Sequence, residues 1–163
     1  MIFPQIRISG TGSHTPSRVV TNDELANQVD TSADWIYENL GIKERHVVDW
    51  ELTSDLAVEA SRKAIESSGI DKEDIDLIIV ATSTPDRKAP STACIVKHKL
   101  GIKNHCPSFD VAAVCTGFVY ALNLAAAQIH MGLAKKVLVV GADCFSSITD
   151  WTRRDCVFFG DGA

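Results

Sequence analysis

The sequence predicts an α/β fold built on a largely parallel sheet, and three observations lead to this prediction. Two continuous apolar runs rich in β-branched residues, at 77–82 and 136–143, have the composition of strands buried on both faces. Segments with apolar residues at helical spacing separate such runs. Glycines and prolines mark the boundaries between the two kinds of segment. Helices that alternate with buried strands are typical of α/β domains.

The first forty residues are expected to form one strand and two helices. Residues 6–9 alternate in polarity and run into the glycine-containing stretch 10–13, which predicts a strand that leaves through a turn. A helix should follow residues 21–22, either of which can cap it. A second helix should start near 30–34 and end at Gly41.

The middle of the chain continues the alternation. Residues 53–55 are expected to cap a longer helix that ends at Gly69. The apolar run 77–82 is the predicted buried strand, and 84–90, with two prolines, is a loop. A further helix should occupy 91–101.

The last third repeats the pattern twice. Residues 109–114 form an apolar run short enough for a buried strand, and a helical pattern follows it and closes at Gly132. The run 136–143 is the next buried strand, and 156–163 has the composition of a strand that is beginning. Because this last segment ends on a turn-like motif, we interpret the chain as the N-terminal part of a longer polypeptide.

Composition limits the classes of partner. With 163 residues, of which 45% are hydrophobic, the chain fits one globular domain or half of a larger one. The net charge of −5 argues against general nucleic-acid binding, which needs clustered cations. No run approaches the ~20 apolar residues of a membrane span and the N-terminus lacks a signal-peptide pattern, so we expect a cytoplasmic protein without a membrane partner. An anionic partner would have to meet one of four basic patches, each of which is otherwise an ordinary solvated face: 43–46, 97–99 with Lys103, 135–136 and 153–154.

The cysteines indicate neither a metal site nor a disulfide framework. No pair has C-x-x-C spacing and no histidine stands at metal-ligand spacing from them. We therefore expect reduced thiols, of which one is a candidate for chemistry. The five are Cys94, Cys106, Cys115, Cys144 and Cys156.

Cys115 is the candidate nucleophile, because it falls where the strand at 109–114 meets the following helix. The unpaired N–H groups and dipole of a helix N-terminus favour a thiolate by roughly 0.3–1 kcal/mol at an exposed position. A thiolate in such a place can attack a carbonyl carbon. Gly117 leaves room for a substrate or for close backbone packing. The alternative is that Cys115 is a small buried core residue.

Eight stretches, in order and across nearly the whole chain, resemble the β-ketoacyl-ACP synthase III family of thiolase-fold condensing enzymes. The stretches are GTGSHTPSRVVTNDEL (10–25), DTSADWI (30–36), GIKERH (41–46), LIIVATSTPD (77–86), APSTAC (89–94), FDVAAVCTGFVYAL (109–122), VLVVGAD (137–143) and FFGDGA (158–163). The resemblance implies a thiolase-like α/β fold with a mixed, largely parallel sheet, in which 1–163 is the first half of a duplicated architecture and the C-terminal half is not in this chain.

The same resemblance implies an activity. Cys115 would accept an acyl group from an acyl-CoA primer, and the acyl-enzyme would then condense with a malonyl thioester, malonyl-ACP or malonyl-CoA, with loss of carbon dioxide. Coenzyme A thioester is thus a substrate, and no tightly bound cofactor is implied. The family also implies a homodimer, and a histidine and an asparagine from the second half that stabilise the malonyl enolate.

The resemblance assigns coenzyme A contacts as well. Trp35, which local sequence alone places in the core or on a stacking face, matches a tryptophan that stacks on adenine, and Thr31 matches a residue of the same pocket. An arginine should cover the other side of the ring. The stretch before 158–163 is one residue shorter than the family pattern, so Arg153 and Arg154 compete for that role. Asn39 stands where many members carry an arginine.

One departure bears on specificity. At the position of Ala89, many priming members have a phenylalanine that closes the acyl pocket of the partner subunit. The smaller side chain of Ala89 predicts that this protein tolerates primers longer than acetyl. Two other readings stay open. The chain could belong to a thiolase-fold acyltransferase or a quinolone- or polyketide-type synthase, or to a non-catalytic dimer partner, against which the presence of Cys115 argues.

Overall fold

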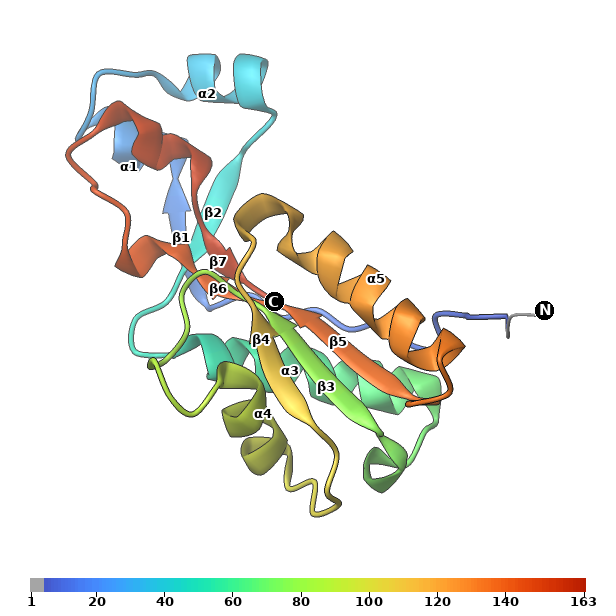
Figure 1. The fold of residues 1–163 in the computed structure, drawn as a ribbon. Coiled ribbons are helices and arrows are strands. Elements are labelled where there is room, and N and C mark those ends of the chain that lie inside the picture. The colour runs from blue at the N-terminus through green and yellow to red at the C-terminus, as the bar shows by residue number, and fades with distance from the viewer. Residues whose placement is uncertain (1–4) are drawn as a thin grey trace.

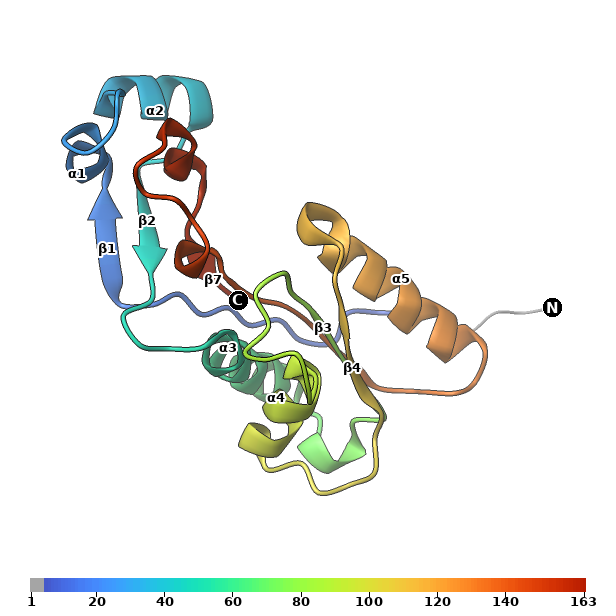
Figure 2. The same cartoon turned by 60° about the vertical axis from the view of Figure 1, so that its left-hand side comes forward.

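The core of the protein is a three-stranded sheet between helices. The structure, a computed structural model, describes residues 5–163. The elements of this core are α3 (Thr53–Ser68), β3 (Leu77–Ala81), α4 (Thr92–Leu100), β4 (Ser108–Val111), α5 (Gly117–His130) and β5 (Val137–Gly141). The strands lie in the order β4-β3-β5 and all run parallel. Helices α3 and α4 cover one face of the sheet and α5 covers the other (Figure 1, Figure 2).

The central strand β3 confirms the prediction of a fully buried strand, since all five of its residues are buried. Ile78 and Val80 pack into the apolar cluster shared with α3 and α4. Ile79 packs on the opposite face, against Ala121 and Ala125 of α5. A strand that alternates between two covered faces has no polar side, which explains the continuous apolar run in the sequence.

A smaller layer stands at one end of the sheet (Figure 2). It consists of β1 (Arg18–Thr21), α1 (Asn22–Ala26), α2 (Ala33–Leu40), β2 (Glu44–Val47) and the short 3₁₀ helix η4 (Arg154–Phe158). Strands β1 and β2 pair antiparallel. The segments share a core of their own: Val20, Leu25, Val29, Ile36, Val47, Cys156 and Val157. Two short strands, β6 (Asp143–Cys144) and β7 (Asp161–Gly162), pair antiparallel at the boundary with the sheet.

Most predicted helix boundaries are confirmed. Thr21 caps α1 in a reciprocal arrangement with Glu24, as the sequence allows. Ser32 caps α2 through the N–H of Trp35. The helices α2, α3 and α4 each end at a glycine with left-handed backbone, namely Gly41, Gly69 and Gly101.

The predicted strand at 6–9 is wrong for the structure of this chain. Residues 5–16 have no regular secondary structure and run along α3. A Cβ on Gly10 would meet the carbonyl oxygen of Ala64, and one on Gly12 would meet that of Ala60. The two glycines therefore permit close contact with helix backbone, and do not form the predicted turn.

Three further boundaries differ from the prediction. Helix α3 begins after Leu52, which leaves the hydroxyls of 53–54 free to bond to other segments. The strand predicted at 109–114 ends at Val111 and lies at the edge of the sheet, where Phe109 is 37% exposed. Residues 156–158, predicted to begin a strand, belong to η4, because Cys156 and Val157 turn into the small core.

Candidate functional site

Cys115 lies at the strand-to-helix junction, as predicted. It is in a single 3₁₀ turn, Val114–Thr116, between the end of β4 and the start of α5. Val114 has φ = 46°, which is a rare backbone conformation for a β-branched residue. Cys115 itself is exposed, so the alternative of a buried core cysteine is wrong for this chain. A sharp, strained turn thus presents the thiol at the surface at a helix N-terminus.

The start of α5 is fixed by close packing on the sheet. A Cβ on Gly117 would lie 3.3 Å from the Cβ of Ala81, the last residue of β3. Phe118 packs against Gly141 at the end of β5, where an added Cβ would lie 3.2 Å from its ring. Thr116 donates from both its N–H and its hydroxyl to the carbonyl oxygen of Ala113. The positive end of the helix is therefore held at the carboxyl ends of the parallel strands, where α/β proteins place ligands.

The other cysteines contrast with Cys115. Cys144 is buried between Glu51 and Thr84, and burial raises its pKa to about 11. Burial also raises the pKa of Cys156, although Arg45 opposes the shift. Both thiols stay protonated at neutral pH and are shielded from reagents. Cys94 is the other exposed cysteine, and its thiol donates to the carbonyl oxygen of Ser108.

Trp35 and Arg154 meet in the smaller layer. The guanidinium carbon of Arg154 lies 4.3 Å from the centroid of the Trp35 ring, a cation–π contact. Arg153 instead forms an ion pair with Asp155 at 3.1 Å. Of the two arginines left open by the sequence, the structure brings Arg154 to the tryptophan. An open pocket of about 480 Å³ lies beside this pair, and its lining residues are Trp35, Arg153, Arg154, Asp155, Val157 and Phe158.

Thr31 and Asn39 flank Trp35 on the same segment. The hydroxyl oxygen of Thr31 is buried and has no hydrogen-bond partner among the described residues. A buried hydroxyl without a partner is uncommon, but Thr31 is not among the residues that line the pocket beside Trp35. Asn39 donates to the carbonyl oxygen of Trp35 at 2.9 Å, within its own helix. Its side chain is therefore engaged inside α2.

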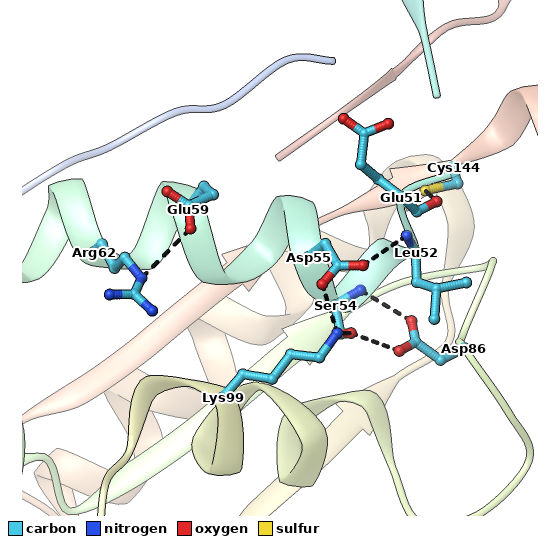
Figure 3. Close-up of polar contacts among 9 residues, drawn as sticks. All are labelled: Glu51, Leu52, Ser54, Asp55, Glu59, Arg62, Asp86, Lys99 and Cys144. Carbon is cyan, nitrogen blue, oxygen red and sulfur yellow. Dashed lines mark hydrogen bonds and ion pairs between the residues drawn. The ribbon is translucent and has the colours of Figure 1, made fainter. Parts of the chain in front are cut away.

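Sequence reasoning missed the network that holds the loop 84–90 (Figure 3). Asp86 accepts from the N–H and the hydroxyl of Ser54, at 2.9 and 2.5 Å, and so caps the first turn of α3 from outside the helix. Lys99 of α4 donates to Ser54 and to Asp55, at 2.6 Å in each case. Burial alone would raise the pKa of Asp55, but the bonds from Lys99 and from the Leu52 N–H outweigh it and the net pKa is lowered. Ala89 lies exposed in the loop that this network anchors.

Two aspartates hold the loops at the carboxyl ends of the strands, and these were also missed. One oxygen of Asp143 accepts from the N–H and hydroxyl of Thr84 and from Ser83. Asp161 accepts from the N–H of Val48 and from Ser146. The sequence does place both aspartates directly next to an apolar run. An acidic side chain at such a position commonly accepts hydrogen bonds from the N–H groups of the adjoining loop.

Cys115 and the Trp35–Arg154 pair occupy different parts of the molecule. The N-terminal end of α5, which follows Cys115, faces the smaller layer with α2 and η4 in both views (Figure 1, Figure 2). No described helix is long and apolar enough to cross a membrane. Within residues 5–163, no group of three or more potential metal-ligating side chains comes together.

Comparison with known proteins identifies relatives over nearly the whole chain. Residues 109–163 match the family model of 3-oxoacyl-[acyl-carrier-protein] synthase III. The β-ketoacyl-[acyl-carrier-protein] synthase III of Neisseria meningitidis serogroup C is 58% identical over 159 residues, which cover 96% of this chain and 50% of that protein. This chain therefore spans about half the length of the curated relatives it matches.

Solved structures agree with the sequence comparison. The 3-oxoacyl-[acyl-carrier-protein] synthase III of Aquifex aeolicus has a TM-score of 0.91 at 45% identity, over 95% of this chain and 50% of that one. The priming β-ketosynthase of the R1128 polyketide pathway has a TM-score of 0.90 at 36% identity, over 96% and 47%. The fold is thus the thiolase-like fold that the sequence resemblance implied.

Proposed function

Because this chain belongs to the β-ketoacyl-[acyl-carrier-protein] synthase III family, we propose that it forms the acyl-accepting half of a condensing enzyme of fatty acid synthesis. The observation that carries the proposal is the exposed Cys115 on a strained turn at the N-terminus of α5. The placement matches what a nucleophilic thiol requires, namely access for a substrate and a nearby positive potential.

The reaction proceeds in two stages. The Cys115 thiolate attacks the carbonyl carbon of an acyl-CoA thioester, the C–S bond to coenzyme A breaks, and the acyl group stays on the cysteine. A malonyl thioester, malonyl-ACP or malonyl-CoA, then loses carbon dioxide, and the resulting carbanion attacks the acyl-cysteine carbonyl. A carbon–carbon bond forms, the thiolate leaves and the product is a β-ketoacyl thioester. The N–H of Cys115 is the group of this turn that we propose helps to stabilise the oxyanion, since those of Thr116 and Gly117 already donate to Ala113 and Val114.

The chain's own residues cover the first stage only. The family's histidine and asparagine partners for the malonyl thioester are expected in the remaining half of the relatives' length. We propose a duplicated architecture in which that half completes the site. Exposed apolar side chains on β4, on α5 and on the turn between them support a protein partner over this face, and a homodimer is the assembly we propose. They are Phe109, Val114, Phe118, Val119, Tyr120 and Leu124.

The Trp35–Arg154 pair is the proposed site for the adenine of coenzyme A. An aromatic face and a guanidinium plane can enclose a purine ring once the Arg154 side chain swings away from its direct contact with Trp35. The pocket beside the pair is open to solvent, as a nucleotide that leaves after acyl transfer requires. Coenzyme A is here a substrate and not a resident cofactor.

Primer length is the finer part of the proposal. Ala89 is exposed at a loop anchored by Asp86, at the position where many family members use phenylalanine to close an acyl pocket. A methyl group leaves that space open, so octanoyl-CoA should acylate the enzyme at a rate comparable to acetyl-CoA. A strict preference for acetyl-CoA would contradict this point.

A second candidate is a priming synthase of polyketide or quinolone type, or a related acyltransferase. It is favoured by the likeness to the polyketide priming synthase and by the small Ala89. The same acyl-cysteine would form, but the acceptor would differ. A non-catalytic partner role is disfavoured, because such a role does not require an exposed thiol on a strained turn.

The test is product formation by the polypeptide that carries this chain. We expect β-ketoacyl-ACP from acyl-CoA and malonyl-ACP, and loss of that product in the Cys115→Ala variant. Cys94→Ala is the matched control, since Cys94 is also exposed but lies on α4. Acyl transfer to the acceptor without release of carbon dioxide would support the acyltransferase instead, and product formation by Cys115→Ala would refute the proposal.

A further inference from the structure

Arg45 is a buried charge without a carboxylate partner. It lies on β2 and is only 5% exposed. Within residues 5–163, no carboxylate lies at ion-pair distance from its guanidinium group. Its Nε is buried and unpaired. Burying a guanidinium among neutral acceptors is unfavourable, so its contacts should account for its presence.

Those contacts join three segments. The two terminal nitrogens of Arg45 donate to the carbonyl oxygen of Val20 at 3.2 Å, to Oδ1 of Asn22 at 2.7 Å and to the carbonyl oxygen of Val157 at 3.5 Å. Val20 is in β1, Asn22 opens α1, and Val157 belongs to η4. One rigid, planar group therefore ties η4 to the strand and helix beside it.

Asn22 extends the connection to the far side of the pocket. It is 6% exposed, and its Nδ2 donates to the carbonyl oxygen of Ile42 at 2.7 Å. Ile42 follows α2, the helix that carries Trp35, by two residues. A continuous chain of hydrogen bonds thus runs from the end of α2 through Asn22 and Arg45 to η4, which carries Arg154.

The segments joined by these hydrogen bonds are also packed closely against one another. A Cβ on Gly160, just after η4, would lie 2.9 Å from the Cβ of Arg45. Val157 is 1% exposed and shares its apolar cluster with Ile36 of α2, on which Trp35 also packs. The segments that carry Trp35 and Arg154 therefore rest on one small core, and the Arg45–Asn22 pair is the polar tie across it.

We propose that Arg45 and Asn22 are positioning residues that fix the relative placement of the segments carrying Trp35 and Arg154, and so keep these two side chains facing each other where the nucleotide of coenzyme A inserts. The proposal rests on the coenzyme A site of the proposed function. Neither residue lines the pocket, so both act through the two segments they join. If the two residues act in this way, removing their hydrogen bonds should change the affinity for coenzyme A and the free energy of unfolding by different amounts.

Replacement of Arg45 separates these two responses. Removing a buried charge that has no ion-pair partner offsets part of the cost of the hydrogen bonds that Arg45→Met removes from Val20 and Asn22. Arg45→Met should therefore leave a folded protein in which η4 and α2 are no longer tied together. Arg45→Lys keeps the charge and at least one donor, and should restore part of the lost affinity. Arg18→Met is the matched control, since Arg18 is exposed on the neighbouring strand β1.

The experiment compares two thioesters. Acylation of Cys115 is measured with an acyl-CoA and with the corresponding acyl-pantetheine, which lacks the nucleotide, and affinity for coenzyme A is measured by calorimetry. For Arg45→Met we expect coenzyme A to bind on the order of tenfold more weakly, with acyl-pantetheine acylation unchanged. Asn22→Asp keeps the acceptor for Arg45 and removes the donor to Ile42, so it should reproduce the same split even if Arg45→Met does not fold.

The results distinguish a role in positioning the coenzyme A site from a role in stability alone. Unchanged coenzyme A affinity in folded Arg45→Met or Asn22→Asp would overturn the proposal. An equal loss with both thioesters, together with a lower melting temperature, would also overturn it, because it would show a purely structural role. Absence of coenzyme A binding by the wild type would instead overturn the proposed function. In that case the indole N–H signal of Trp35 in the NMR spectrum still tests the tie, since it should shift in Arg45→Met and not in Arg18→Met.

Discussion

The sheet layer and the smaller layer organise chemistry in different ways. Cys115 owes its place to one continuous strand, turn and helix, and every contact that fixes the turn comes from that segment or from strand ends beside it. Trp35 and Arg154 meet only because α2 and η4, far apart in the sequence, pack on one core. A site of the first kind depends on local backbone geometry, whereas a site of the second kind depends on the buried groups that hold its parts together.

The largest effect is expected where the local site is most crowded. In Gly117→Val, the new side chain would press on Ala81 of β3, where the Cβ alone already lies 3.3 Å away. Displacing the start of α5 by even ~1 Å should slow acylation of Cys115 about a hundredfold. Overpacking should also lower the free energy of unfolding by roughly 1–3 kcal/mol. The measurements are acylation followed by mass spectrometry and urea unfolding.

Ala127→Val controls for helix propensity, because Ala127 is exposed on the same helix. It should cost only a few tenths of a kcal/mol and leave acylation unchanged. If both variants slowed acylation equally, the turn geometry would not be the cause.

A smaller effect is expected at the composite site, and two neighbouring arginines offer a matched pair. Arg154→Ala removes the guanidinium face that we propose stacks on the adenine, a contact worth roughly 0.5–2 kcal/mol, and should weaken coenzyme A binding by about three- to thirtyfold. Arg153→Ala removes only an exposed ion pair with Asp155 and should have little effect. Calorimetry with coenzyme A measures both. The reverse ranking would mean that the arginine at the ligand is not the one that contacts the tryptophan in this structure.

The smallest effect is expected in the network that anchors the loop 84–90. Lys99→Met removes two bonds at the start of α3, but both charged groups are about one-third exposed, so the loss should be at most about 1 kcal/mol. The pKa of Asp55 is lowered in the folded protein, so its contribution is present above its unfolded pKa of ~3.9 and is lost as the pH falls through the lowered value.

The stability difference between wild type and Lys99→Met should accordingly be largest at neutral pH and shrink under acid conditions to the part that comes from the bond between Lys99 and Ser54. Urea unfolding of both proteins across this range provides the measurement. Lys103→Met is the control, since within residues 5–163 Lys103 forms hydrogen bonds through its backbone N–H and not through its side chain. A difference that stays the same size below the folded pKa of Asp55 would contradict the role of the Lys99–Asp55 pair.

The features that the sequence predicts well are those with a local cause. The buried strand β3, the cap at Thr21 and the glycine at the end of α2 each follow from side-chain chemistry within a few residues. The position of Cys115 at a helix start follows in the same way.

The features that it misses depend on contacts between distant segments. Residues 6–9 alternate like a strand, yet no described strand pairs with them. The hydroxyl of Ser54 could cap its own helix, but Asp86 and Lys99 bind it instead. The choice of Arg154 over Arg153 at Trp35 requires the packing of η4, which turns residues 156–158 away from the predicted strand. Nothing in the local pattern marks these partners.

The central claim, that Cys115 accepts the acyl group, is tested most directly by mapping the adduct. The protein is incubated with an acyl-CoA, digested under conditions that preserve thioesters, and its peptides are weighed. We expect one acyl group on the peptide that contains Cys115, and none on the peptide of Cys94, which is also exposed. An acyl group on Cys94, or equal modification of the wild type and the Cys115→Ala variant, would contradict it.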